Sequence, residues 1–270
     1  MRYFYLVFIM FMFFSCQNKK TTSSENTIHK TPEFTIKNNA KGEKIIADLE
    51  NSTQAKLREA SLISYEFQQD KYQIERDCGW YEFSRIFSNS TDRDSLVLDN
   101  MEIVQYLKGE KVDDLADSTK TRLGKEMKTE LFFAELIFGL NSPTARKKYL
   151  ENEKINEKDY AKLKVEFIED NNDQDYLVET VFWIDDKTEK LDFIAVKFGE
   201  NTFNYQFLKP INQREIEGIS FFDYEVYTPQ KNKDFAIEEM AKLFEENKLD
   251  KKENQVYKNI EVILKDKNCD

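Results

Sequence analysis

Few side chains in this sequence have the chemistry of a nucleophile, a general base or a metal ligand. The 270 residues include three cysteines, Cys16, Cys78 and Cys269, and one histidine, His29. Because His29 lies in a polar segment before the main body of the chain, a histidine-based triad or an imidazole metal site in that body is excluded. The seven glycines are scattered and form neither a GxGxxG pattern nor a Walker loop, which argues against the usual nucleotide enzymes.

Paired carboxylates are the next candidates for chemistry. Asp113–Asp114 and Asp185–Asp186 are residues with which a glycosidase could protonate a leaving group and activate a water molecule. Adjacent residues of a strand point to opposite sides, however, and both pairs fall in expected solvated turns. We therefore expect no catalytic residue among them.

The stretch NNDQD offers oxygen ligands for calcium through Asn171, Asp173 and Asp175. An EF-hand loop needs a glycine after the third ligand and a glutamate six residues further on. Tyr176 and Phe182 occupy those two positions, so a turn is expected instead of a metal site. The sequence predicts neither a metal nor a cofactor.

Cys16 follows a short apolar run. Residues 3–14 are twelve consecutive apolar or aromatic residues behind the single charge of Arg2. A membrane-spanning helix needs about 20 such residues, whereas roughly 7 to 15 are typical of a secretory signal. The junction of Ser15 and Cys16, a small residue followed by a cysteine, resembles the lipobox of bacterial lipoproteins, with Phe13 where an aliphatic residue is usual. The resemblance implies a lipoprotein signal peptide at residues 1–15 and an acylated Cys16; an ordinary signal cut near Ser15 is the alternative.

Residues 16–39 are polar and show no apolar period, so they are expected to form a flexible tether. Such a coil would reach roughly 25–30 Å from a membrane surface. Gln17 follows the cysteine, and by resemblance to the sorting rule of bacterial lipoproteins a residue other than Asp favours the outer membrane. We expect a lipid-anchored protein of the cell envelope, at the outer membrane and facing the periplasm.

Cys78 and Cys269 are the two remaining thiols of a chain expected in an oxidising compartment, where such a pair often forms a disulfide. The sequence gives no distance between them, so bonded and free cysteines both stay open. Cα atoms more than about 7 Å apart would exclude the bond.

Residues 40–270 are long enough to bury a substantial core as one β-rich domain. The chain has 51 acidic and 40 basic residues and a formal net charge of −11, which argues against nucleic acid and anionic lipid surfaces as partners.

Aromatic and β-branched residues gather in segments separated by polar turns, a pattern typical of an antiparallel meander. The predicted strands are 62–67, 79–87, 96–107, 161–169, 177–184, 191–198, 203–208, 219–227 and 255–264. Helices are predicted at 40–51, 118–140 and 234–248, the last with Asp234 as its N-cap and an apolar stripe that includes Ile237 and Met240. This order predicts an α+β domain dominated by one curved sheet.

Two predicted strands, 178–184 and 191–198, are apolar at both sets of alternating positions. Phe182 and Ile184 should point to one side and Trp183 to the other, and Phe193 should oppose Phe198. A sheet that is apolar on both faces must be covered on both.

One cover is the segment ELFFAELIFGL at 130–140, which is apolar on nearly every side and is therefore expected to be inserted between surfaces. The plain interpretation is a thick core that leaves no sizeable void. The sharper one is an unclosed barrel with a helical plug over an apolar groove of several hundred Å³. Candidate groove residues are Phe133, Ile137, Phe182, Trp183, Phe193 and Phe198.

Three motifs resemble an uncharacterised family of Bacteroidota envelope lipoproteins: WIDDKTEKLDFIAVKF, FGLNSP and EGISFFDYEVYTP. The resemblance spans most of residues 40–265. That family is similar in architecture to the lipoprotein carriers LolA and LolB, whose unclosed barrel holds acyl chains under helices. The resemblance implies a LolA-like half-barrel. The acyl-contacting residues of the carriers have no matching positions here.

The resulting hypothesis is an acylated, non-enzymatic envelope protein that binds a lipid, an acyl chain or an apolar peptide in the half-barrel groove. Its partners would be a membrane, through the N-terminal acyl chains, and an apolar ligand or an envelope protein. The alternative is a structural or assembly component of the envelope with no small ligand. A carboxylate-based glycoside hydrolase is the third. Lipid that co-purifies with the domain would distinguish the first hypothesis from the second.

Overall fold

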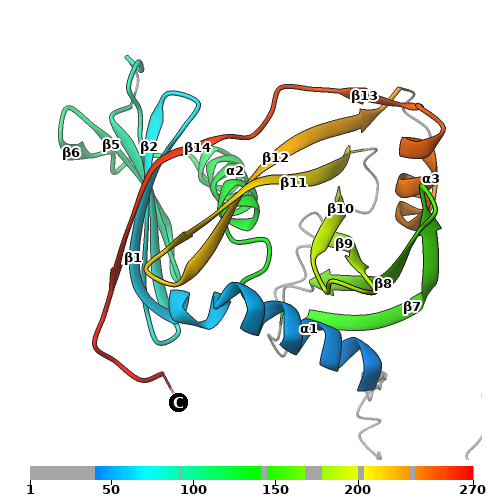
Figure 1. Cartoon of the computed structure of the whole chain (residues 1–270). Helices are drawn as coiled ribbons and strands as arrows, with labels where there is room; N and C mark the ends of the chain where they lie inside the picture. Colours follow the sequence, from blue (N-terminus) through cyan, green and yellow to red (C-terminus); the bar gives the residue numbers. More distant parts are fainter. Residues whose placement is uncertain are drawn as a thin grey trace, which may run out of the picture. The chain divides into compact units, whose positions relative to one another are not determined.

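A computed structural model describes residues 40–91, 93–140, 145–167, 178–199, 204–230 and 235–269 (Figure 1). The chain divides into two units, Met1–Thr35 and Ile36–Asp270, and the described residues all belong to the second. The expected signal peptide, Cys16, the tether, the NNDQD turn and the Asp234 cap lie outside the described residues.

Antiparallel strands form two open seven-stranded sheets. The first sheet contains, in spatial order, β14 (Tyr257–Leu264), β1 (Ala60–Phe67), β2 (Asp70–Asp77), β3 (Trp80–Ile86), β4 (Ser95–Asp99), β5 (Ile103–Leu107) and β6 (Glu110–Lys111). The second sheet contains β13 (Leu249–Lys251), β12 (Ile219–Pro229), β11 (Asn204–Ile216), β10 (Leu191–Phe198), β9 (Val178–Asp185), β8 (Lys158–Phe167) and β7 (Ala145–Ile155). The predicted α+β class with unclosed antiparallel strands is confirmed, with the strands divided between two sheets.

The helices of the described residues are α1 (Ala40–Thr53), the 3-10 turn η1 (Ala55–Glu59), α2 (Asp117–Ala134), the 3-10 turn η3 (Ile237–Glu239) and α3 (Met240–Glu245). The third predicted helix is thus shorter than expected. It ends where Asn247 takes a φ of 53° and the N–H of Lys248 donates to the carbonyl of Leu243. A left-handed residue at this place stops a helix.

The central strands of the second sheet are buried on both faces, as predicted. Phe182, Ile194 and Phe198 belong to one hydrophobic cluster together with α1 and the segment after α2. Trp183 and Phe193 belong to another, which η3 and α3 cover. Alternate side chains of a strand point to opposite faces, so each face needs its own helical layer.

Helix α2 serves both sheets. Leu123 and Met127 pack in the cluster of the first sheet, whereas Phe133, near the end of the helix, packs in that of the second. The helix ends at Glu135, whose backbone N–H donates to the carbonyls of Leu131 and Phe132. Residues 135–140 form turns instead of the predicted helix. The predicted plug is confirmed, but its second half, residues 135–140, is a turn segment. Residues 133–140 are here called the cover segment.

The C-terminal part of the chain passes from one sheet to the other. Gln255 makes an isolated bridge with Tyr224 of β12, and two residues later β14 begins and pairs with β1. Asp223 fixes this passage, because it accepts hydrogen bonds from the backbone N–H of Tyr257 at 3.0 Å and from both guanidinium N–H groups of Arg214. The two sheets are therefore tied together next to the start of β14.

Cys78 and Cys269 form a disulfide, with Cα atoms 5.0 Å apart. This separation lies within the usual range for such a bond. Cys78 lies in the turn before β3, and Cys269 follows β14. The bond therefore fastens the C-terminal end of the chain to the first sheet.

Candidate ligand site between the two sheets

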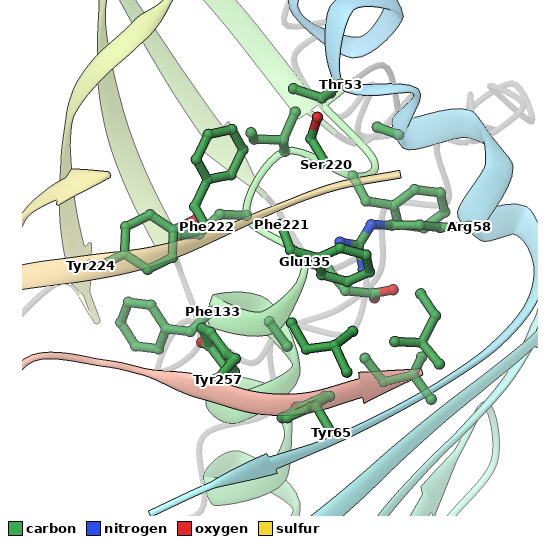
Figure 2. A pocket seen from close by; sticks show the side chains of 18 residues that line it. Thr53, Arg58, Tyr65, Phe133, Glu135, Ser220, Phe221, Phe222, Tyr224 and Tyr257 are labelled. Atoms are coloured by element: carbon green, nitrogen blue, oxygen red, sulfur yellow. The ribbon is translucent and has the colours of Figure 1, made fainter. Parts of the chain in front are cut away.

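An interior cavity lies beneath the cover segment, where the two sheets face one another. Its walls come from η1, β1 and β2, from β12, from β14 and from the cover segment. The lining residues are Thr53, Ala55, Arg58, Ile63, Tyr65, Ile74, Phe133, Ala134, Glu135, Leu136, Ile137, Phe138, Ser220, Phe221, Phe222, Tyr224, Tyr257 and Ile260 (Figure 2). The cavity volume is about 30 Å³, room for about two water molecules.

The apolar wall on the side of the cover segment is aromatic. Phe133 lies with its ring centroid 5.8 Å from that of Phe132 and 5.3 Å from that of Phe198. Tyr224 and Tyr257 face this wall from β12 and β14 (Figure 2). Aromatic rings at such distances pack favourably, so this end of the cavity suits an apolar group.

An ion pair holds the cover segment to the first sheet. The Arg76 Nε–H donates to Glu135 Oε1 at 3.0 Å, and the Arg76 Nη2–H donates to Glu135 Oε2. The Arg76 guanidinium also lies 4.4 Å from the ring centroid of Phe138. Burial would lower the pKa of Arg76, but the charge of Glu135 raises it above its usual value. The paired charges thus connect β2 to the cover segment inside a mostly apolar region.

Arg58 is the cation among the residues that line the cavity, whereas Arg76 contacts the site through Glu135. Its side chain extends into the pocket with its guanidinium 4.6 Å from the ring centroid of Phe221 (Figure 2). The residue is 6% exposed, and its Nη1 has no hydrogen-bond partner among the described residues. Burial lowers the pKa of Arg58, against the attraction of Glu135.

The six predicted groove residues do not lie together. Phe133 and Ile137 line the cavity, and Phe182 and Phe198 pack in the same cluster without reaching it. Placing Trp183 and Phe193 in this groove is wrong, because both point to the opposite face of the second sheet. There the Trp183 indole N–H donates to Glu153, and Phe193 stacks on Phe207.

The cavity beside Phe133 is far smaller than the several hundred Å³ that the groove interpretation requires. A groove of about 450 Å³ exists elsewhere, between α1, the β9–β10 turn and β11. Its lining mixes polar residues such as Asp48 and Lys190 with apolar ones such as Phe222, and contains none of the six predicted residues. The packed aromatic side chains of the cover segment fill the space that an open groove would need.

Sequence reasoning missed the three charged residues of the site. Glu135 had a detectable signal, since it is a carboxylate in the middle of an apolar segment. Arg58 and Arg76 had none. Each is followed or preceded by other charged residues, and only the packing of η1 and β2 against the cover segment makes them interior.

Asp185 corrects a second expectation, that both carboxylate pairs lie in solvated turns. Asp113, Asp114 and Asp186 are exposed, but Asp185 is buried. Burial would raise the pKa of Asp185, but hydrogen bonds from the Lys158 ammonium and from the backbone N–H groups of Thr188 and Lys187 hold it well below its usual range. The carboxylate stabilises the β9–β10 turn.

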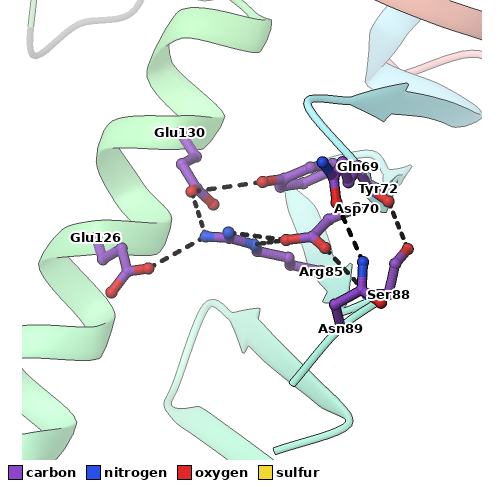
Figure 3. Close-up of polar contacts among 8 residues, drawn as sticks. All are labelled: Gln69, Asp70, Tyr72, Arg85, Ser88, Asn89, Glu126 and Glu130. Carbon is purple, nitrogen blue, oxygen red and sulfur yellow. Dashed lines mark hydrogen bonds and ion pairs between the residues drawn. The ribbon is translucent and has the colours of Figure 1, made fainter.

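A second polar cluster joins α2 to the first sheet. Arg85 on β3 donates to Asp70 on β2 and, through Nη1, to Glu126 at 3.1 Å and Glu130 at 2.6 Å on α2 (Figure 3). The Tyr72 hydroxyl lies 3.5 Å from Glu130 Oε1. One arginine thus pairs with three carboxylates. Burial raises the pKa of Glu130 to about 7, against the attraction of Arg85, which lowers it.

The raised pKa predicts a pH-dependent stability. The folded chain keeps a proton on Glu130 that the unfolded chain releases, so this contribution is complete below the unfolded pKa of about 4.3 and is lost as the pH rises through about 7. In the wild type, the free energy of unfolding measured by urea titration should fall by about 1–3 kcal/mol between about pH 5 and pH 7.5. This fall should be absent in Glu130→Gln. Glu126→Gln should remove part of it, because the Glu126 charge contributes to the raised pKa of Glu130. An unchanged pH slope in Glu130→Gln would contradict the assignment.

Within the described ranges, no group of three or more His, Cys, Asp or Glu side chains is arranged to hold a metal ion. In the same part of the chain no helix has the length and apolar character needed to span a membrane.

The fold and the cavity define an α+β protein in which two open antiparallel sheets enclose a partly charged interior beneath a helix end. Residues 3–256 match the model of DUF6503, a family of unknown function, and the chain belongs to this family. Among curated proteins, no sequence matches this chain.

Three solved structures align with this chain at low sequence identity. A DUF1329 family protein from Desulfovibrio piger is 9% identical with a TM-score of 0.46, covering 82% of this chain and 91% of its own. A LolA superfamily protein from Nitrosomonas europaea is 10% identical with a TM-score of 0.46, covering 84% and 94%. A putative outer membrane lipoprotein-sorting protein domain from Vibrio parahaemolyticus is 14% identical with a TM-score of 0.42, covering 69% and 85%. Each comparison concerns the fold alone.

Proposed function

We propose that this protein is a non-enzymatic, acylated lipoprotein of the cell envelope that binds a lipid, an acyl chain or an apolar peptide between its two sheets. The observation that carries the proposal is the cavity beneath the cover segment, with an aromatic wall at one end and the buried Arg58 at the other. A closed core needs no buried charge, and burying one without a partner costs free energy. A ligand-binding role would explain why the charge is there.

Ligand entry requires the cover segment to move. Sites for small molecules usually have volumes of about 300–1,000 Å³, far above the closed cavity. Residues 135–140 are turns without the continuous hydrogen bonding of a helix, and they are connected to the first sheet through Arg76 and Glu135. Displacement of Phe133, Leu136 and Ile137 would uncover the apolar face of the second sheet. In this proposal the described conformation is the closed one.

The small volume favours a second candidate, a structural or assembly component of the envelope whose interior is only a core. The two functions differ in whether the protein retains lipid. Mass spectrometry of protein purified from its native membrane, without added lipid, should find bound acyl compounds if the first proposal is correct, and none if the second is.

Phe133 and Phe193 form a matched pair for this test, because both are 7% exposed but lie on opposite faces of the second sheet. Phe193→Ala should lower the free energy of unfolding by about 3–5 kcal/mol and leave lipid retention unchanged. Phe133→Ala should cost less than about 3 kcal/mol and lower the amount of retained lipid, since Phe133 lines the cavity wall. A full core cost for Phe133→Ala with no change in retained lipid would favour the structural candidate.

The membrane anchor is a separate prediction. Cys16→Ala should abolish labelling by a clickable palmitate analogue and move the protein out of the membrane fraction, because several acyl chains provide a firm anchor and none would remain. Cys78→Ser is the control and should keep both labelling and membrane association, since Cys78 is engaged in a disulfide. Labelling that persists in Cys16→Ala would exclude this residue as the acylated one.

A further inference from the structure

Arg58 differs from three other buried or half-buried arginines in the contacts of its guanidinium group. Arg76, Arg85 and Arg214 each donate hydrogen bonds to a carboxylate, of Glu135, Asp70 and Asp223 respectively. No carboxylate lies within hydrogen-bond distance of the Arg58 guanidinium among the described residues, where its one contact is the ring of Phe221. The guanidinium nonetheless lies in the interior.

The surroundings of Arg58 do not supply the missing anion. Both oxygens of Glu135 accept hydrogen bonds from Arg76. The Thr53 hydroxyl, which also lines the cavity, donates to the carbonyl of Leu49. The Ser220 hydroxyl accepts from the side chain of Gln213. An isolated buried cation is unfavourable without a partner, so the cavity lacks one negative group in the closed form.

The cavity is polarised along its length. Arg58 lies toward one end and Phe133 and Tyr224 lie toward the other, where the walls are aromatic (Figure 2). The two ends match the two parts of an amphiphile, because guanidinium groups bind carboxylates and phosphates through parallel hydrogen bonds and aromatic walls accept a hydrocarbon chain.

We propose that Arg58 binds the anionic head group, a carboxylate or phosphate, of an amphiphile whose chain lies against Phe133 and Tyr224. This assignment rests on the proposed function, because it names the ligand class of the same cavity. It distinguishes charged amphiphiles from neutral lipids and from apolar peptides without an acidic group.

The test uses the full-length protein, solubilised and stripped of lipid, with three probes of equal chain length: palmitate, hexadecyl phosphate and hexadecanol. Isothermal titration should find that both anions bind about tenfold or more tightly than the alcohol, because a charge-assisted hydrogen bond is lost with the alcohol. Arg58→Met should reduce all three to similar affinities, and Arg58→Lys should keep part of the preference. Arg122→Met, which removes an exposed arginine of α2, should behave as the wild type.

Thermal unfolding adds a readout that a purely structural arginine would not give. Without ligand, Arg58→Met should melt at the wild-type temperature or above it, because the substitution removes a buried charge that has no bonded partner. A marked decrease would assign Arg58 to the core and overturn the proposal.

The outcomes distinguish the head-group assignment from the proposed ligand-binding function. If all three probes bind the wild type equally, or Arg58→Met keeps the preference, the head-group assignment is overturned and the apolar-ligand function stands. If no probe binds, the function is overturned and the assignment with it. Acetate or inorganic phosphate binding as tightly as palmitate would make the site one for small anions and also overturn the assignment.

Discussion

Glu135→Gln is expected to lower the free energy of unfolding by about 3–5 kcal/mol, because removing one partner of a buried ion pair leaves an uncompensated charge. The Glu135 side chain is 5% exposed and that of Arg76 is 16% exposed, so water cannot replace the lost carboxylate. Arg58 would also lose the carboxylate charge of Glu135, which favours its protonated form. Urea unfolding at neutral pH measures the effect.

Two controls define this prediction. The double variant Arg76→Met, Glu135→Leu should recover most of the lost stability, since a buried pair can be replaced by apolar residues at little cost. Asp48→Asn breaks an exposed ion pair, because the side chains of Asp48 and Lys44 are 42% and 75% exposed. This substitution should cost less than about 1 kcal/mol. A Glu135→Gln variant no less stable than Asp48→Asn would show that the pair does not hold the cover segment.

Removing the disulfide with Cys78→Ser and Cys269→Ser together should destabilise the protein by about 5 kcal/mol in the chain-entropy model, because the bond closes a loop across 191 residues. The bond also lies beside Arg76 and Phe138 in a surface pocket, so its loss should loosen the contact of the cover segment with the first sheet.

Reduction provides the matched measurement for this prediction. A reducing agent should lower the urea midpoint of the wild type to that of the double variant and leave the double variant unchanged. The expected result fails if the reduced and oxidised proteins unfold at the same urea concentration.

The apolar segments of the fold could be predicted from the sequence, because their amino-acid composition alone indicates buried strands. Each of the nine predicted strand segments overlaps a strand of the structure. The two-faced burial of β9 and β10 followed from the apolar runs 181–184 and 193–196, which place apolar side chains at both sets of alternating positions. One predicted strand, 96–107, is a hairpin, since Asp99 accepts hydrogen bonds from the N–H groups of Met101 and Glu102 and turns the chain.

Strands β2 and β7 were not predicted, because charged residues dominate them. In β2 only Tyr72 and Ile74 are buried, and the side chains between them face away from the core. In β7 the buried Lys147 forms an ion pair with Glu43 at 3.3 Å. Pairing with neighbouring strands fixes such segments, and tertiary context overrides their weak β-propensity.

The site was harder to predict than the fold for a related reason. Arg58, Arg76 and Glu135 come from three separate elements, and nothing local distinguishes the two arginines from surface cations. Their burial depends on how the cover segment packs across both sheets. Phe133 and Ile137 were found because an apolar helix must be buried somewhere.

The passage of the chain from the second sheet to β14 has a consequence for the order of events during synthesis. β1 is among the first strands made, yet one of its two neighbours is the last strand of the chain. Until the final residues emerge, the hydrogen-bonding edge of β1 stays open, and open edges recruit other chains. Contacts between such distant residues also slow folding. The nascent protein therefore passes through a period in which its earliest strand is unprotected, and loss of the residues from Tyr257 onward would expose the edge of β1 to aggregation.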